Sequence, residues 1–184
     1  MRKIGAGLFI SLDGVYEAPD QWHFPYFNDE MGQEIDAQVQ AADTLLFGRQ
    51  TYQEFESYWP QQGSEVELAD YFNKTPKLVV SNTLKSVTWA NSTLISGDIN
   101  AELTRIKSLP GKNIGITGSG ALVRSLLRDG LLDELRLLVH PIAVNSGKRL
   151  FDGLGTGESD RIPLQLLESK RLTTGVLALT YAHA

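Results

Sequence analysis

Short apolar runs rich in β-branched residues alternate along the chain with helical patterns, and this alternation constrains the possible folds more than any other feature. Met31, Ile35 and Val39 recur at four-residue spacing, which is typical of one face of an amphipathic helix. Apolar residues between Leu122 and Leu127 form a second stripe of this kind. Because parallel neighbouring strands need a crossover that is usually helical, the alternation favours a mostly parallel α/β sheet with helices on both faces.

The expected elements keep this strand–helix order until the tail of the chain. The expected strands cover residues 4–10, 44–47, 77–81, 93–96, 113–117 and 134–140. The expected helices carry the Met31 face, follow Gly48, and cover residues 68–73, 101–109 and 121–128. In the tail, residues 164–172 and 176–181 flank Thr173-Thr174-Gly175, which is a hairpin pattern. The sheet is therefore expected to end in an antiparallel hairpin.

Size and composition favour one globular domain over residues 1–184. Hydrophobic residues make up 42% and charged residues 21% of the chain, which is enough apolar surface for a core. The formal net charge of −5 disfavours nucleic acid as a main partner, because binding the phosphate backbone needs clustered cations. No apolar stretch approaches the ~18 residues that a membrane span needs, and we expect a cytoplasmic protein.

The residue types that most often bind metals give no metal-site pattern. The chain has no cysteine, which excludes disulfide bonds, thiolate metal sites and a cysteine nucleophile. The histidines, His23, His140 and His183, are far apart in the sequence and lack metal-ligand spacing. No metal site is therefore expected.

The first of three candidate ligand-binding loops follows the expected strand at 113–117. A parallel sheet binds ligands beyond the carboxyl ends of its strands, so polar loops there are more significant than ordinary turns. Glycines between a strand and a helix let backbone N–H groups approach a phosphate at the helix N-terminus. The third glycine of the full dinucleotide motif is absent, and a tight turn remains the alternative. The candidate residues are Gly118, Ser119, Gly120, Ala121 and Leu122.

Two other strand ends carry groups that suit a phosphate. Gly48 permits a sharp turn, Arg49 offers a fork of donors, and Thr51 can cap a helix or donate to a phosphate. A capped helix with an exposed arginine is the alternative. After the strand at 77–81, hydroxyl, amide and ammonium groups suit the phosphomonoester that separates NADPH from NADH, although a polar turn would have the same composition. These last residues are Ser81, Asn82, Thr83 and Lys85.

A carboxylate follows the first expected strand. Asp13 comes directly after Ser11-Leu12 and precedes Gly14, which makes it a candidate acid or substrate ligand. Asp-Gly is also a common turn pair, and both interpretations stay open.

Taken together, these segments resemble the dihydrofolate-reductase-like superfamily. Within it they are similar to small bacterial reductases related to the reductase domain of the bifunctional riboflavin-biosynthesis deaminase–reductase. The segments occur in family order and span nearly the whole chain. They are Ser11-Leu12-Asp13-Gly14, Leu46-Phe47-Gly48-Arg49-Gln50-Thr51-Tyr52, Val79-Val80-Ser81-Asn82-Thr83-Leu84, Thr117-Gly118-Ser119-Gly120 and Gly147-Lys148-Arg149-Leu150-Phe151.

The resemblance implies a three-layer dihydrofolate-reductase-like fold with NADPH lying across the sheet. It implies that Arg49 and Thr51, together with the loop that begins at Ser81, hold the adenosine-phosphate half of the cofactor. The turn at 118–122 would hold the pyrophosphate, and the loop from Asp13 would cover the nicotinamide and the substrate. The resemblance also implies a homodimer.

One departure from the superfamily concerns the catalytic acid. In dihydrofolate reductases the loop after the first strand leads through a W-x-L-P-x-D-like stretch whose acid serves pterin protonation. Here the stretch runs from Trp22 to Phe27, and Phe27 takes the place of the acid. Folate reduction is therefore not expected. Asp13 is the first candidate for substrate binding or proton delivery, and Glu30 is the second.

The leading functional hypothesis is hydride transfer from NADPH to a small polar substrate, heterocyclic or sugar-derived, with the cofactor supplying the redox chemistry. Such an activity is similar to the reductase step of riboflavin biosynthesis. Two alternatives stay open. The chain could be a nucleotide-binding module without turnover, which the missing folate-type acid favours, or a dihydrofolate reductase proper.

Overall fold

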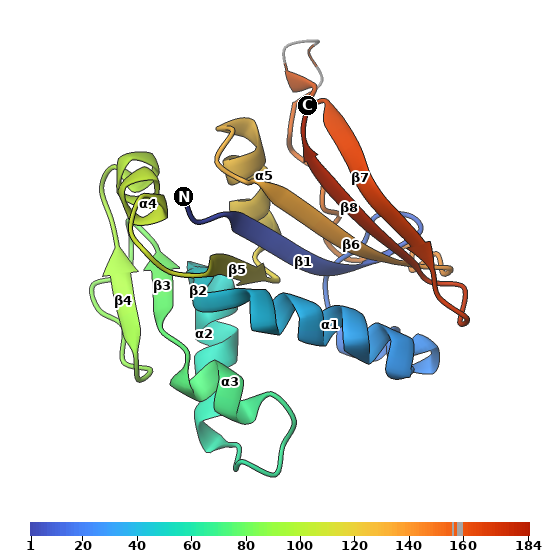
Figure 1. Ribbon diagram of the computed structural model, residues 1–184, viewed down its shortest axis with the longest axis horizontal. Helices are drawn as coiled ribbons and strands as arrows, with labels where there is room; N and C mark the ends of the chain where they lie inside the picture. Colours follow the sequence, from blue (N-terminus) through green and yellow to red (C-terminus); the bar gives the residue numbers. More distant parts are fainter. Residues whose placement is uncertain (156, 158–159) are drawn as a thin grey trace.

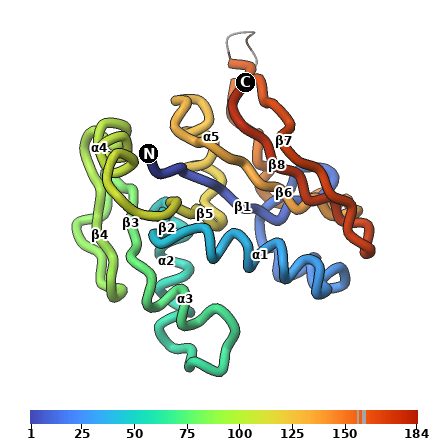
Figure 2. Tube along the Cα trace, in the orientation of Figure 1, coloured from blue at the N-terminus to red at the C-terminus, as the bar shows by residue number. Residues whose placement is uncertain are grey.

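The computed structural model describes residues 1–155, 157 and 160–184, and these residues form one central sheet of eight strands. The strands are β1 (Ile4–Ser11), β2 (Ala42–Gly48), β3 (Lys77–Val80), β4 (Ser92–Ile95), β5 (Asn113–Thr117), β6 (Glu134–His140), β7 (Leu164–Arg171) and β8 (Leu177–His183). They lie in the order β4-β3-β2-β5-β1-β6-β8-β7. Figure 2 shows the β7–β8 hairpin at the edge of the sheet opposite to β4.

Strand direction follows the prediction from the sequence. All neighbouring pairs from β4 to β6 are parallel. β8 pairs antiparallel with both β6 and β7, which makes the antiparallel edge. The predicted mostly parallel α/β sheet with a C-terminal hairpin is therefore confirmed.

Helices cover both faces of the sheet, as Figure 1 shows, with α1, α2 and α3 on one face and α4 and α5 on the other. Among the described residues, none of them is both long and apolar enough to pass through a membrane. The helices are α1 (Asp29–Ala41), α2 (Arg49–Tyr58), α3 (Ala69–Lys74), α4 (Ile99–Lys107) and α5 (Gly120–Arg128), with the short 3-10 helices η1 (Pro19–Gln21), η2 (Phe24–Tyr26) and η3 (Trp59–Gln61).

Local chemistry explains where these elements depart from the expected bounds. Helix α4 begins at Ile99 rather than 101, because the Asp98 side chain accepts a 3.0 Å hydrogen bond from the Ala101 N–H and caps the helix there. The segment expected to be a loop before α1 contains η1 and η2. A proline in the first turn of each presets the backbone φ angle for a helical turn.

The two faces of the sheet have different cores. Alternate residues of a strand point to opposite faces. On one face, Ile4, Ala6 and Leu8 of β1 are buried in a single large cluster with the apolar stripe of α5. The opposite face carries two separate clusters, one around Phe47 under α2 and α3 and one around Met31 beside α1. The division of the core on this face leaves room for a cavity.

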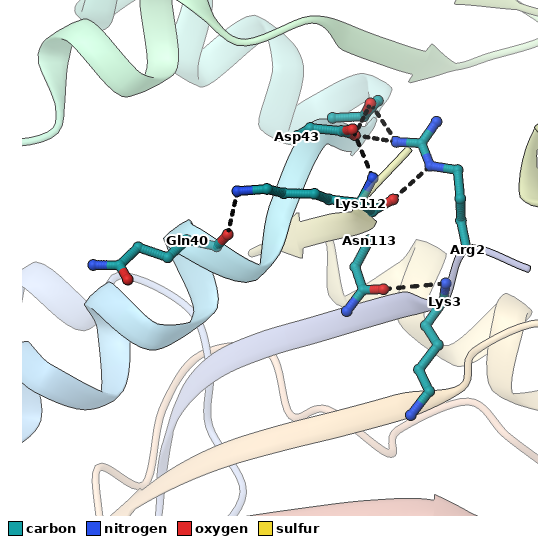
Figure 3. A network of polar contacts seen from close by, with 7 residues as sticks. Arg2, Lys3, Gln40, Asp43, Lys112 and Asn113 are labelled. Carbon is teal, nitrogen blue, oxygen red and sulfur yellow. Dashed lines mark hydrogen bonds and ion pairs between the residues drawn. The ribbon is translucent and has the colours of Figure 1, made fainter. Parts of the chain in front are cut away.

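The amino ends of the central strands are joined by a polar network, shown in Figure 3. The Asp43 carboxylate at the start of β2 forms an ion pair with Arg2 and accepts a 2.7 Å hydrogen bond from the Lys112 N–H. Arg2 Nε also donates to the Lys112 carbonyl at 2.6 Å, and Lys112 Nζ donates to the Gln40 carbonyl in α1 at 3.1 Å. These bonds hold the amino edge of the sheet together and leave ligand binding to the opposite edge.

Candidate functional site

A cavity of about 650 Å³ lies on the face that α1, α2 and α3 cover. Its floor includes Gly5 and Gly7 of β1 and Gly115 of β5, which carry no side chains of their own. These glycines sit side by side, because Gly5 and Gly115 are register partners in the parallel pair of β1 and β5. The cavity therefore occupies the gap between the two core clusters, and it extends to the carboxyl edge of the sheet at Gly48 and Ser119.

The two predicted turns at this edge are bonded to each other. Ser119 and Gly118 have left-handed backbone conformations, with φ of 53° and 66°. In this conformation the Ser119 N–H donates to the Thr51 hydroxyl at 3.0 Å, and the Gly48 N–H donates to the Ser119 hydroxyl at 3.0 Å. The turn from β2 into α2 and the turn from β5 into α5 therefore form one unit at the mouth of the cavity.

The first turn of α5 lines the cavity through Gly120, Ala121 and Leu122. The Ser119 side chain does not cap this helix, because its hydroxyl is used by Gly48. The first backbone N–H groups of a helix lack intrahelical partners and carry the positive end of its dipole, so they favour an anionic group. This turn has the chemistry of a pyrophosphate site.

Tyr16 packs against this turn and was missed by the sequence analysis. A Cβ atom added to Gly120 would overlap the Tyr16 ring, so glycine is needed here for a contact within the protein. Tyr16 also lines the cavity. No spacing rule connects a tyrosine in the loop after β1 to the start of a helix more than a hundred residues later.

Arg49, the first residue of α2, also lines the cavity. Its side chain is exposed, and its guanidinium donates to the neutral Gln53 side chain at 3.3 Å. Its charge is therefore available to an anionic ligand at the mouth of the cavity.

The third predicted loop lies further along the same edge of the sheet and does not line the cavity. The Ser81 hydroxyl accepts hydrogen bonds from the Thr83 and Leu84 N–H groups at 3.1 and 3.0 Å, which is a local turn. The Asn82 side chain accepts from the Gly97 N–H at 2.7 Å, and Lys85 is exposed. The structure joins the first two predicted loops directly, whereas this one is separated from the β5 turn by β2.

The Asp13 carboxylate is engaged by the loop that follows β6. It accepts hydrogen bonds from the Ser11 hydroxyl at 2.6 Å and from the Val144 and Asn145 N–H groups at 2.9 Å each, and Arg149 lies 3.5 Å away. The hydrogen bond from Ser11 has the largest effect, and together these bonds hold the pKa of Asp13 well below its ordinary value. The low pKa keeps Asp13 ionised, and Asp13 is not among the residues that line the cavity. Its role in substrate binding or proton delivery stays a prediction.

Glu30 is also used within the protein. It lies in the first turn of α1 and accepts hydrogen bonds from the Thr173 hydroxyl at 2.6 Å and the Thr173 N–H at 2.7 Å. Both hydrogen bonds lower the pKa of Glu30, and the one from the Thr173 hydroxyl has the larger effect. The carboxylate joins α1 to the β7–β8 turn, and Glu30 is not among the residues that line the cavity. Its predicted catalytic role stays a prediction.

Two histidines that are distant in the sequence meet in an aromatic cluster near the end of β6. The His23 ring stacks on Phe9 with centroids 4.6 Å apart, and His140 contacts the Trp22 ring edge-on at 5.1 Å. His23 Nδ1 and His140 Nε2 are buried and have no hydrogen-bond partner among the residues that the structure describes. Burial lowers the pKa of both rings and therefore favours their neutral forms. The wide sequence separation of the two histidines concealed this pairing.

Comparison with known proteins supports the family resemblance. The family model described as the RibD C-terminal domain matches residues 2–178. The uncharacterized protein YyaP of Bacillus subtilis (strain 168) is 28% identical over 184 residues, with 98% of this chain and 94% of YyaP covered.

Solved structures share the whole fold. A protein assigned to riboflavin biosynthesis from Shewanella sp. PV-4 has a TM-score of 0.77 at 21% identity, with 99% of each chain covered. A diaminohydroxyphosphoribosylaminopyrimidine deaminase/5-amino-6-(5-phosphoribosylamino)uracil reductase from Thermotoga maritima has a TM-score of 0.70 at 10% identity. That match covers 100% of this chain and 57% of the larger protein. The predicted three-layer, dihydrofolate-reductase-like fold is confirmed.

Proposed function

Because this chain belongs to the RibD C-terminal domain family, we propose that it is an NADPH-dependent reductase of the riboflavin-biosynthesis type. Its substrate would be a small heterocyclic or sugar-derived molecule that binds in the cavity. The observation that carries this proposal is the pair of bonds between Ser119 and the Gly48–Thr51 turn. They place a helix N-terminus and an available arginine at the mouth of one cavity.

The residues at the carboxyl edge fit a phosphorylated dinucleotide. The first turn of α5, from Gly118 to Leu122, would hold the pyrophosphate through its backbone N–H groups. Arg49 and Thr51 would hold the adenosine-phosphate half of NADPH, with the Ser81–Lys85 loop beyond them. The cofactor, when bound, supplies the hydride. The protein would orient the substrate in the cavity and keep water from it.

Titration calorimetry with NADPH and NADH tests the cofactor assignment. We expect NADPH to bind more tightly, because Arg49 and the Ser81–Lys85 loop can meet the extra phosphate. Loss of NADPH absorbance in the presence of a heterocyclic substrate tests the reductase activity. Equal affinity for the two cofactors would remove these residues from the proposed site, and absence of NADPH binding would remove the proposed function itself.

A nucleotide-binding module without turnover is the second candidate. It is favoured by the state of Asp13 and Glu30, because both carboxylates are bonded within the protein and neither lines the cavity. Tight NADPH binding without oxidation by any member of a heterocycle panel would support it. Folate reduction is not proposed, because the apolar and partly exposed Phe27 stands where a folate-type acid would be needed.

We also propose that the protein is a homodimer, with the β7–β8 hairpin as the contact surface. Strand β7 is an edge strand, and its Leu166 and Leu167, at the register shift in the β7–β8 pairing, are 50% and 51% exposed. Exposed apolar side chains on an unpaired edge favour association with another chain. Light scattering of the purified protein tests this, and a monomer at micromolar concentration would contradict it. The cytoplasmic location stays a prediction.

A further inference from the structure

Both positive charges beside the cavity floor are ion-paired to the same carboxylate. Lys3 and Arg136 both line the cavity, and Glu134 lies between them on the same face of the sheet. Lys3 Nζ lies 2.7 Å from Glu134 Oε1, and Arg136 Nη2 lies 2.7 Å from Glu134 Oε2. The hydrogen bond to Glu134 and its negative charge raise the pKa of Lys3. A phosphate that approached these cations would have to displace Glu134 or lie against its negative charge.

The remaining two cations of the cavity lining lie at its mouth. Lys148 Nζ is 2.7 Å from Glu17 Oε1, so its charge is neutralised as well. Arg49 is the cation left with a neutral partner among the described residues of the lining, and the proposed function assigns it to the cofactor. The described lining therefore offers no unpaired cation for a phosphate on the substrate.

Two uncharged polar groups of the lining also remain available. A Cβ atom added to Gly7 would overlap the side-chain carbonyl of Gln38, so the Gln38 amide lies directly on the bare backbone of β1. Neither the Gln38 amide nor the Tyr71 hydroxyl has a hydrogen-bond partner among the residues that the structure describes, and both side chains line the cavity. An amide offers a donor and an acceptor side by side, which can bind the edge of a lactam or an amidine ring.

The floor of the cavity is partly bare backbone, and its walls are largely apolar. Gly5 lies beside Gly7 on the floor. A Cβ atom added to Gly5 would have the Glu134 Cβ and carbonyl oxygen as its nearest neighbours, both at 4.0 Å, so the backbone there is open. The walls are largely apolar, with Ile35 and Val39 from α1 on one side and Phe55 from α2 on the other. An apolar cavity with a few placed polar groups favours a largely apolar ring with a polar edge over a flexible charged chain.

We propose that the substrate is an uncharged, planar heterocycle without a phosphate group, and that the Gln38 amide binds its donor–acceptor edge. This inference rests on the proposed function, because it takes the cavity as the substrate site of a reductase. The proposed substrate therefore differs from that of the Thermotoga maritima reductase, because the name of that enzyme specifies a phosphoribosyl group.

A matched pair of ligands tests the class of substrate. Calorimetry would compare 5-amino-6-(5-phosphoribosylamino)uracil with the same compound after removal of its phosphate, and 2,4-dihydroxypteridine would serve as a flat ring without a sugar. We expect removal of the phosphate to leave the affinity unchanged or raise it, and added salt to have little effect on the preferred ligand. A loss of about tenfold or more on removing the phosphate would overturn the proposal. Failure of all three probes to bind would overturn it too.

Substitutions test the two groups that carry the argument. Gln38→Leu keeps the size of the side chain but removes its donor and acceptor, and should weaken binding of the uncharged probe by about tenfold. Gln33→Leu, on an exposed position of the same helix, is the matched control and should have no effect. Glu134→Gln frees Lys3 and Arg136, and should raise the affinity for the phosphorylated probe alone. Unchanged binding in Gln38→Leu, or no gain for the phosphorylated probe in a folded Glu134→Gln protein, would contradict the proposal.

Failure of this inference can be told apart from failure of the proposed function. NADPH binding is measured first, and its absence would overturn the reductase assignment whatever the probes do. The probes are then titrated into both the cofactor-free and the NADPH-saturated protein. A protein that binds NADPH but prefers the phosphorylated probe keeps its proposed function and loses only the inference about its substrate.

Discussion

The Thr51 hydroxyl accepts a 3.0 Å hydrogen bond from the backbone N–H of Ser119, which lies 68 residues further along the chain. This bond joins the first turn of α2 to the turn before α5. Since Ser119 also accepts from the Gly48 N–H, each turn holds the other in place. The shape of the proposed cofactor site therefore depends on Thr51 as much as on the glycines.

Thr51→Val should weaken NADPH binding and destabilise the fold. Valine has nearly the same shape but cannot accept the Ser119 N–H, and an unsatisfied backbone donor costs about 1–3 kcal/mol. Calorimetry and thermal melting measure the two effects. Thr51→Ser keeps the hydroxyl and is the control, so a serine variant as impaired as the valine variant would show that the methyl group, not the hydrogen bond, matters.

Arg49→Ala should cost about 1–3 kcal/mol of NADPH affinity, the range for a charge-assisted hydrogen bond. The affinity for NADH should change much less, because NADH lacks the extra phosphate. Arg128→Ala is a suitable control, since Arg128 is also exposed but lies at the other end of α5. If Arg49→Ala weakens both cofactors equally, Arg49 contacts a group that the two share.

Gly120→Val should destabilise the protein and abolish cofactor binding, because a Cβ at this position overlaps the Tyr16 ring. Overpacking of this kind costs about 1–3 kcal/mol. The same substitution in a Tyr16→Ala background separates two causes in a double-mutant cycle. Recovery of stability without recovery of NADPH binding would support backbone approach to the pyrophosphate. Recovery of both would assign Gly120 to packing against Tyr16 alone.

Asp13→Asn should lower the melting temperature, although an amide supports an ordinary turn almost as well as a carboxylate. The reason is that the Asp13 carboxylate accepts from the Val144 and Asn145 N–H groups at once, whereas the amide nitrogen would face one of these donors. Because the pKa of Asp13 is held low, the pH dependence of any turnover near neutral pH should not change. A shifted pH profile in this variant would return Asp13 to the role of proton donor.

Stability should fall as the pH drops below the ordinary histidine value of 6.5, because burial lowers the pKa of both His23 and His140 in the folded state. The His140 charge further lowers the pKa of His23, and Asp20 opposes this shift. In this range the unfolded chain binds protons that the folded chain does not, so acid favours unfolding. Thermal melts between pH 8 and pH 5 measure the slope. His23→Phe should flatten it, and an unchanged slope would show that other groups titrate.

Local patterns in the sequence were sufficient to predict the elements and their order. Two-residue and four-residue periodicities indicate which side of a strand or helix is apolar. This information is contained in residues that are close together in the sequence. The Gly118–Gly120 turn was predictable for a similar reason, since left-handed backbone there favours glycine at Gly118. The rule that parallel strands bind ligands at their carboxyl ends then selected the Arg49 and Gly118 loops.

Which side chains remain available for a ligand was decided only by the tertiary structure. Asp13 and Glu30 looked like free acids, but Val144, Asn145 and Thr173 bind them from segments more than a hundred residues away. Nothing in the sequence distinguishes Glu134 from other polar strand residues, yet in the fold it is ion-paired with both Lys3 and Arg136. The spacing of residues in the sequence indicates which residues are local neighbours and which face of a helix or strand each one occupies. The partner of a charge is set by which distant segments pack together, and that pairing determines what the cavity can bind.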